Sequence, residues 1–264
     1  MNSPITAGID IGSLSTDAVV LSGERILGYA IVPTLSSSEL AAQSAYDTAL
    51  QAAGLARDEV TAVVATGYGR GSIDFADRAI TEITCHAVGA RRLFAGARTV
   101  IDVGGQDSKV IRLGADGRVE DFSMNDKCAA GTGRFLEVMA RSLDTQLESL
   151  GSLSERSTRE IRISSTCTVF AESEVVALVA KGAAKEDIIR GLHRSVAQRI
   201  YAMVTRLRAG PPFVMTGGVA KNRGVVLAIE ECLGHALLVP EEPQIVGALG
   251  AAIIAGRGDK PRVT

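Results

Sequence analysis

Short motifs recur in pairs along this 264-residue chain, and the first pair contains an acidic residue close to a glycine. GIDIGSLSTDAVVL (8–21) resembles TVIDVGGQDSKVIRL (99–113). Both have an apolar run, an aspartate, one more apolar residue and a glycine, and a β-rich run follows. Asp10 aligns with Asp102. A strand, a tight glycine turn and a second strand form a β-hairpin, so each segment predicts a hairpin whose first strand carries a carboxylate near its end.

A second pair of motifs follows in the same order. VTAVVATGYGR (60–70) and PPFVMTGGVAKN (211–222) each read as a buried strand that ends in Thr-Gly. In this pair Thr66 aligns with Thr216. Two motifs repeated in the same order indicate an internal duplication, with a boundary near residues 95–99.

Helical patterns alternate with these strands, and this mixture predicts an α/β fold of two similar lobes. We expect a first lobe over residues 1–97 and a second lobe over 98–264. The last helical pattern, 244–256, leaves open a return onto the first lobe. The expected helices are 38–53, 78–95, 129–143, 168–181, 185–208, 221–233 and 244–256.

Composition limits the compartment and the partners. The chain is 46% hydrophobic and 22% charged, which is typical of a globular protein. Its net charge of −2 argues against a general nucleic-acid surface or a basic membrane-binding face. We find no apolar run of membrane-spanning length and no room for a signal peptide before the first strand, so we expect a cytoplasmic protein. In that compartment cysteines are more often metal-binding, catalytic or buried than disulfide-bonded.

The two aspartate–glycine turns suit phosphate and magnesium. Backbone N–H groups of such a turn form a concavity for anions, and a nearby carboxylate can hold Mg²⁺ directly or through water. One turn of this kind is common in ordinary hairpins. Two copies plus the glycine pair of TGGVAKN (216–222) are more specific, because they could clamp a polyphosphate and seat a nucleoside.

Two cysteines precede helical patterns in MNDKCAAGTGRFLEVMA (124–140) and SSTCTVFAESEV (164–175). Cys128 and Cys167 are therefore expected at helix N-termini, where the dipole and free N–H groups stabilise a thiolate or an anionic cluster. The small residues after Cys128 would let a bulky inorganic group approach the backbone. From the residues alone, buried cysteines without a metal stay an open alternative.

The chain resembles, over nearly its whole length, the ATP-dependent activator components of 2-hydroxyacyl-CoA dehydratases. ATGYGR, VIDVGGQDSKVI, TGGVAKN and the two cysteine motifs carry this resemblance. That family also includes ATPase subunits of benzoyl-CoA reductases and of double-cubane-cluster reductases. It lies in the superfamily of actin, sugar kinases and heat-shock chaperones, so the resemblance implies two duplicated ribonuclease-H-like lobes.

The resemblance also implies the nucleotide site. It gives Asp10, Asp102 and Gln106 as catalytic candidates and the two aspartates as Mg²⁺ ligands. Lysine is usual where Asp17 stands, and Lys109 could supply the missing positive charge. The residues expected to bind ATP are Gly12, Ser13, Leu14, Ser15, Thr16 and Asp17 in the first loop, Gly104, Gly105 and Gln106 in the second loop, Gly217 and Gly218 on the adenosine side, and Gln244 near the last helix.

A [4Fe–4S] cluster usually takes four thiolates, and this chain offers Cys128 and Cys167 at matching positions. The resemblance implies that two subunits share one cluster across a twofold axis. Cys85 and Cys232 lie in apolar helical patterns and are expected to be core residues. The three histidines, His86, His193 and His235, lack metal-ligand spacing and are assigned no chemistry.

The function implied is a homodimeric iron–sulfur ATPase that couples ATP hydrolysis to transfer of one low-potential electron. The acceptor would be an iron–sulfur 2-hydroxyacyl-CoA dehydratase, and the donor a ferredoxin or flavodoxin. A benzoyl-CoA reductase or double-cubane-cluster reductase is the alternative acceptor. Two alternatives from other classes are a small-molecule kinase of the same fold without a cluster and a nucleotide-binding regulator.

Overall fold

The structure is a computed structural model that describes residues 3–164 and 167–257. Residues 1, 2, 165, 166 and 258–264, which the expected lobe limits include, lie outside the described residues. The chain divides into two compact units. Unit 1 comprises Met1–Ala97, Gly114–Val119 and Gln244–Thr264, and unit 2 comprises Arg98–Leu113 and Glu120–Pro243.

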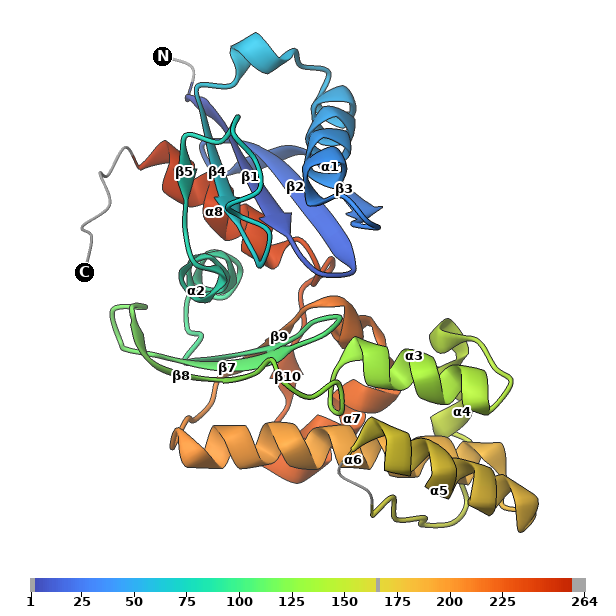
Figure 1. Cartoon of the computed structure of the whole chain (residues 1–264). Coiled ribbons are helices and arrows are strands. Elements are labelled where there is room, and N and C mark those ends of the chain that lie inside the picture. Colours follow the sequence, from blue (N-terminus) through green and yellow to red (C-terminus); the bar gives the residue numbers. More distant parts are fainter. Residues whose placement is uncertain (1–2, 165–166, 258–264) are drawn as a thin grey trace. The chain divides into compact units, whose positions relative to one another are not determined.

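Unit 1 contains a five-stranded sheet in its described residues, with strand order β3-β2-β1-β4-β5 (Figure 1). β1 pairs antiparallel with β2 and parallel with β4. Its strands are β1 (Ile5–Ile11), β2 (Ser15–Ser22), β3 (Arg25–Pro33), β4 (Ala62–Thr66) and β5 (Arg78–Ala79), and its helices are α1 (Ser38–Ala53), η1 (Arg57–Glu59), α2 (Glu82–Leu93) and α8 (Val246–Gly256).

Alternating side chains of this sheet pack against different helices, as the period of two in a strand requires. On β1, Ile9 and Ile11 join the core formed with α1, whereas Val19 and Leu21 of β2 pack with α8. A Cβ atom at Gly8 would collide with the Ala248 carbonyl oxygen, so glycine lets α8 approach the strand closely. The sheet is thus covered by α1 on one face and α8 on the other.

Unit 2 repeats the strand order of unit 1 when its sheet is followed from β8 to β10, so that β8, β7, β6, β9 and β10 correspond to β3, β2, β1, β4 and β5. Its described sheet runs β10-β9-β6-β7-β8, again with an antiparallel hairpin and a parallel neighbour around the central strand β6. The strands are β6 (Thr99–Val103), β7 (Ser108–Leu113), β8 (Val119–Asn125), β9 (Phe213–Thr216) and β10 (Leu237–Leu238), and the helices are α3 (Gly133–Ser142), η2 (Leu147–Ser149), α4 (Leu150–Ser154), α5 (Thr168–Ala180), α6 (Lys185–Arg206), η3 (Gly218–Lys221) and α7 (Arg223–Leu233).

The strand registers support the aligned motifs residue by residue. Asp10 lies opposite Thr66 in unit 1, and Asp102 lies opposite Thr216 in unit 2. The central strand of each unit thus carries an aspartate beside a threonine that ends the neighbouring parallel strand. The two halves are copies of one α/β arrangement.

Some expected helices begin later than the sequence indicates. The pattern at 78–95 splits into β5 and α2, because Thr81 caps the helix and its side chain accepts a hydrogen bond from the Thr84 N–H. The short α4 was not expected. No helix among the described residues is long and apolar enough to cross a membrane.

Candidate functional site

The first loop joins β1 to β2 in a tight turn. The Gly12 N–H donates to the Ser15 carbonyl at 3.0 Å, and a Cβ atom on Gly12 would lie 2.7 Å from that oxygen. The Thr34 hydroxyl, directly after β3, donates to the Gly12 carbonyl at 2.8 Å and fixes the turn. Ser13 and Leu14 at the tip are accessible, whereas Thr16 is buried. The tip of this turn is therefore accessible, and its base is held by hydrogen bonds.

The second loop, in unit 2, repeats this turn. The Gly104 N–H donates to the Asp107 carbonyl at 3.0 Å, the same bond at the equivalent position. Gly105 is half-buried and Gln106 is exposed at the tip. The structure therefore gives both expected phosphate loops the same backbone geometry.

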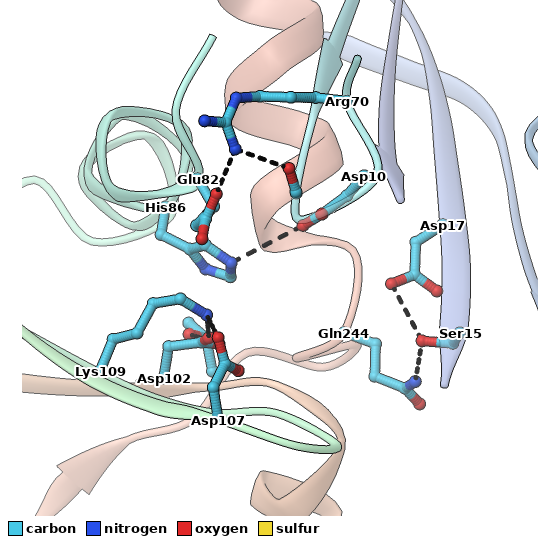
Figure 2. A network of polar contacts seen from close by, with 12 residues as sticks. Asp10, Ser15, Asp17, Arg70, Glu82, His86, Asp102, Asp107, Lys109 and Gln244 are labelled. Carbon is cyan, nitrogen blue, oxygen red and sulfur yellow. Dashed lines mark hydrogen bonds and ion pairs between the residues drawn. The ribbon is translucent and has the colours of Figure 1, made fainter. Parts of the chain in front are cut away.

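Asp102 lies buried at the base of the second loop. Its Oδ1 accepts a 2.8 Å hydrogen bond from the Thr216 hydroxyl, and its Oδ2 lies 3.3 Å from Lys109 Nζ (Figure 2). The same ammonium group lies 2.7 Å from Asp107 Oδ2. Gly217 has a φ of 85°, and a Cβ atom there would lie 2.9 Å from Asp102 Oδ1. A side chain at Gly217 would thus crowd the carboxylate, whereas Gly218 is exposed.

Asp10 is the matching carboxylate in unit 1 and is 8% exposed. A Cβ atom at Gly67 or at Gly247 would collide with one of its two carboxylate oxygens. His86 Nε2 lies 3.7 Å from Asp10 Oδ2, within ion-pair distance (Figure 2). Sequence reasoning missed His86, because a single histidine on the distant helix α2 carries no spacing signal.

Asp17 lies opposite Asp10 in the β1–β2 register, as Lys109 lies opposite Asp102 in the β6–β7 register. The Ser15 hydroxyl donates to Asp17 Oδ2 at 3.4 Å and accepts from Gln244 Nε2 at 3.4 Å (Figure 2). Gln244 therefore joins the first loop. Its contact with nucleotide, and that of Asp17, stay predictions.

The helix after Cys128 begins later than expected. Asn125 Nδ2 donates to the carbonyls of Cys128 and Ala130, at 2.9 and 3.3 Å, and holds this segment in a loop. Gly131 has a φ of 91°, in the left-handed region that glycine tolerates, and α3 starts only at Gly133. The expected placement of Cys128 at a helix N-terminus was wrong. It lies half-buried in the loop that precedes the helix.

Cys167 is the N-cap residue of α5, as expected, and its side chain is exposed. Cys85 is fully buried beside α8, and burial raises the pKa of its thiol to about 12. Cys232 is half-buried against the core of unit 2, and burial also raises its pKa. A raised pKa opposes the thiolate form that binds metal. Burial therefore disfavours Cys85 and Cys232 as metal ligands, and Cys128 and Cys167 remain the candidate pair.

The donor atoms fit the groups that the sequence predicts. Buried carboxylates at the base of accessible turns are hard oxygen donors, which Mg²⁺ prefers, and thiolates suit iron–sulfur clusters. Among residues 3–164 and 167–257, no three His, Cys, Asp or Glu side chains are grouped closely enough to hold a metal ion.

Comparisons with known proteins agree over nearly the whole chain. The sequence matches the profile of the BadF/BadG/BcrA/BcrD ATPase family over residues 7–255. It is 48% identical over 250 residues to the activator of lactoyl-CoA dehydratase from Anaerotignum propionicum, covering 95% of this chain and 96% of that protein. The crystal structure of (R)-2-hydroxyglutaryl-CoA dehydratase component A from Acidaminococcus fermentans superposes with a TM-score of 0.93 at 44% identity, covering 97% of this chain and 98% of that chain.

A second solved structure carries nucleotide. The activator of the 2-hydroxyisocaproyl-CoA dehydratase from Clostridium difficile, with bound ADPNP, gives a TM-score of 0.91 at 42% identity and covers 98% of this chain and 100% of that chain. One of the benzoyl-CoA reductase subunits from Thauera aromatica is less similar, at 33% identity over 262 residues, 94% of this chain and 92% of that protein.

A ROK family glucokinase from Streptomyces griseus shares the fold alone, with a TM-score of 0.61, 17% identity and coverage of 96% of this chain and 100% of that chain. This likeness to a sugar kinase confirms the predicted fold class. The family, in contrast to the fold, is shown by the profile match and by relatives that are more similar in sequence and are covered almost completely. The chain belongs to the BadF/BadG/BcrA/BcrD ATPase family.

Proposed function

We propose that this protein is a homodimeric [4Fe–4S] ATPase that couples ATP hydrolysis to the transfer of one low-potential electron to a 2-hydroxyacyl-CoA dehydratase. The observation that carries the proposal is the end-to-end likeness to proteins named as dehydratase activators, together with both cysteine motifs. Membership of an ATPase family and the two phosphate-loop turns disfavour a regulator without turnover.

The nucleotide would be held by the backbone N–H groups of the two turns. Asp10 and Asp102 would bind Mg²⁺ directly or through water, because both are buried at the base of these turns and flanked by glycines. Gly217 and Gly218 would face the adenosine. Exposed Gln106 is the candidate for orienting the attacking water.

Cys128 and Cys167 would bind the cluster. The loop around Cys128 suits a bulky inorganic group, because it contains small residues and the left-handed Gly131. When bound, the cluster supplies reversible one-electron chemistry at a potential set by hydrogen bonds to sulfur and by exposure. Two thiolates per chain match half of the usual ligand set, so a second copy would complete it.

The surface of α5 supports a homodimer. Four of its apolar side chains are 43–68% exposed, although the apolar side chains of a helix in a globular protein normally face the core. The helix begins beside Cys167, so a second copy that covers it would also bring the thiols of the two chains together. The four exposed residues are Val169, Phe170, Val176 and Val179.

Direct hydrogen bonds support coupling between nucleotide and cluster. The Gly133 N–H donates to the Gly104 carbonyl at 2.9 Å, and the Arg134 N–H donates to the Gly105 carbonyl at 2.8 Å. These bonds join the second phosphate loop to the first residues of α3, the helix that follows Cys128. A change of this loop on hydrolysis would therefore be transmitted to the cysteine loop.

The electron would come from a reduced ferredoxin or flavodoxin, which loses one electron, and would pass to the iron–sulfur dehydratase, which gains it. A benzoyl-CoA or double-cubane-cluster reductase is the second candidate acceptor, supported by the weaker likeness to the benzoyl-CoA reductase protein of Thauera aromatica. A cytoplasmic location belongs to this proposal, because free thiols persist in reducing compartments.

Anaerobic purification tests the proposal. We expect a brown protein that absorbs near 400 nm and contains about two iron atoms per protomer, half of a four-iron cluster. Cys128→Ser and Cys167→Ser should lose the iron, whereas the control variant Cys232→Ser should retain it. Four irons per isolated monomer, or a colourless protein, would contradict the proposal.

A further inference from the structure

The two copies of the hairpin differ at one position beside the central aspartate. In unit 2 the residue opposite Asp102 is Lys109, and its ammonium group lies 3.3 Å from Asp102 Oδ2. In unit 1 the residue opposite Asp10 is Asp17, which is a second buried carboxylate. Like charges directly opposite each other in an antiparallel pair are destabilising. The positive partner of the aspartate in unit 2 is thus replaced in unit 1 by an acid.

A ring nitrogen reaches Asp10 from another element. His86 extends from α2, its side chain is 6% exposed, and its Nε2 lies 3.7 Å from Asp10 Oδ2 (Figure 2). This ion-pair contact in unit 1 occupies the place of the contact that Lys109 makes with Asp102 in unit 2, although it comes from a helix instead of the hairpin.

Close backbone packing holds the imidazole in place. A Cβ atom at Gly250 of α8 would collide with the Cys85 carbonyl, so the two helices cross in contact next to His86. Gly247, in the first turn of α8, leaves no room for a side chain beside Asp10 Oδ2, and a Cβ atom there would lie 3.0 Å from His86 Nε2. The Asp10 carboxylate and the His86 imidazole both pack closely against Gly247 of α8.

We propose that His86 is the positioning residue for Asp10: it holds Oδ2 so that the carboxylate meets Mg²⁺-nucleotide in one fixed orientation. This inference rests on the proposed Mg²⁺-ATPase function. Groups that hold a metal-binding carboxylate typically change metal affinity or activity by about 10–100-fold when they are removed. His86 would act through Asp10 and would not contact the nucleotide itself.

The test compares two substitutions of His86 with one control. His86→Leu keeps much of the volume and removes the donor, whereas His86→Gln keeps an N–H donor. The control is His193→Gln, because His193 is equally buried but lies in unit 2 and contacts Asn222. Mn²⁺ replaces Mg²⁺ as the probe, and its binding is followed by electron paramagnetic resonance at saturating ADP. ADP binding without metal is measured by calorimetry.

We expect His86→Leu to weaken Mn²⁺ binding about 10–100-fold, with metal-free ADP binding unchanged, and His86→Gln to recover part of the loss. Control variant and wild type should bind Mn²⁺ alike. Wild-type Mn²⁺ affinity in His86→Leu, or an equal loss in metal-free ADP binding, would overturn the positioning role. If His86→Leu does not fold, His86→Asn, which is polar but shorter, replaces it under the same criteria. Failure of the wild type to bind Mn²⁺ with ADP would instead count against the proposed function.

Discussion

At the scale of single residues, buried charge is concentrated at the ends of the two central strands. Asp102 is 3% exposed and Lys109 is 5% exposed, so each would be costly to bury alone. The Thr216 hydroxyl and the Lys109 ammonium group satisfy separate oxygens of Asp102. The carboxylate is thereby held rigidly, which is what a metal-binding or phosphate-orienting group needs.

Asp102→Asn should lower Mg²⁺-dependent ATPase activity by roughly 10²–10³-fold, because it removes a charge near the metal and phosphates while an amide oxygen can still accept from Thr216. Asp10→Asn should act in the same direction. Phosphate release at saturating ATP measures the effect, and exposed Asp121→Asn is the control. Both site variants should keep wild-type iron content. Full activity in both would show that the phosphate-loop assignment is wrong.

At the scale of elements, unit 2 is held by helices that meet at a buried histidine. His193 of α6 is 1% exposed and packs against the backbone of α7 at Gly224, where a Cβ atom would collide with the ring. Its Nε2 lies 3.3 Å from Asn222 Nδ2. Burial lowers the pKa of His193 from 6.5 to about 4. The folded protein therefore keeps this imidazole neutral.

This pKa predicts how stability depends on pH. Between pH 6.5 and about 4 the unfolded chain binds a proton that the folded chain does not, so stability falls as pH decreases through that range. At pH 5 the contribution of His193 lowers the free energy of unfolding by about 2 kcal/mol relative to neutral pH. His193→Gln should remove that part of the pH dependence. Urea unfolding followed by circular dichroism at both pH values measures it, and an unchanged pH dependence would contradict the assignment.

The hydrogen bonds between the second phosphate loop and α3 lead to a prediction about nucleotide state. A ligand shifts a conformational equilibrium only by its differential affinity for the two states. If this loop differs between ATP and ADP, iron chelators should remove the cluster at clearly different rates with ADP and with a non-hydrolysable ATP analogue. The analogue should also raise the affinity for the acceptor protein. By linkage, the acceptor protein should then raise the affinity for the analogue by the same factor. Equal rates and equal affinities would leave the ATPase and the cluster uncoupled.

At the scale of the whole molecule, the proposed function leaves two requirements that one chain does not meet: a cover for the exposed apolar side chains of α5 and two further thiolates for a four-iron cluster. A second copy would satisfy both. Exposed apolar clusters on a globular protein often mark interaction surfaces. Assembly and cluster binding should therefore depend on the same residues.

Phe170→Asp should convert the proposed dimer into monomers and lower the iron content, because it places a charge among the exposed apolar side chains of α5, where Phe170 is 68% exposed. Tyr29→Asp is the matched control, since Tyr29 is 46% exposed on β3 in unit 1. Light scattering coupled to anaerobic size-exclusion chromatography measures both variants. A dimeric Phe170→Asp with full iron content would exclude α5 as the interface.

Local patterns were enough to predict the duplicated hairpins, most helices and the two turns. Glycine turns and alternating apolar residues act over a few positions, so the sequence shows them directly. The aligned aspartates and threonines occupy equivalent register positions in the two units, as an internal duplication requires. The predicted lobe boundary and the roles of the site residues stay predictions.

Only the tertiary structure revealed the contacts that join distant segments. The return of α8 onto the sheet of unit 1 brings Gly247 to Asp10, and the packing of α2 brings His86 to the same carboxylate. The sequence does not show that His86, and not His193, lies beside a carboxylate of the candidate site. It also does not show that Cys128 lies in a loop and not at a helix start. Burial and long-range packing decide both. Side chains far apart in the chain meet when the core closes, and their chemistry depends on neighbours that no local pattern encodes.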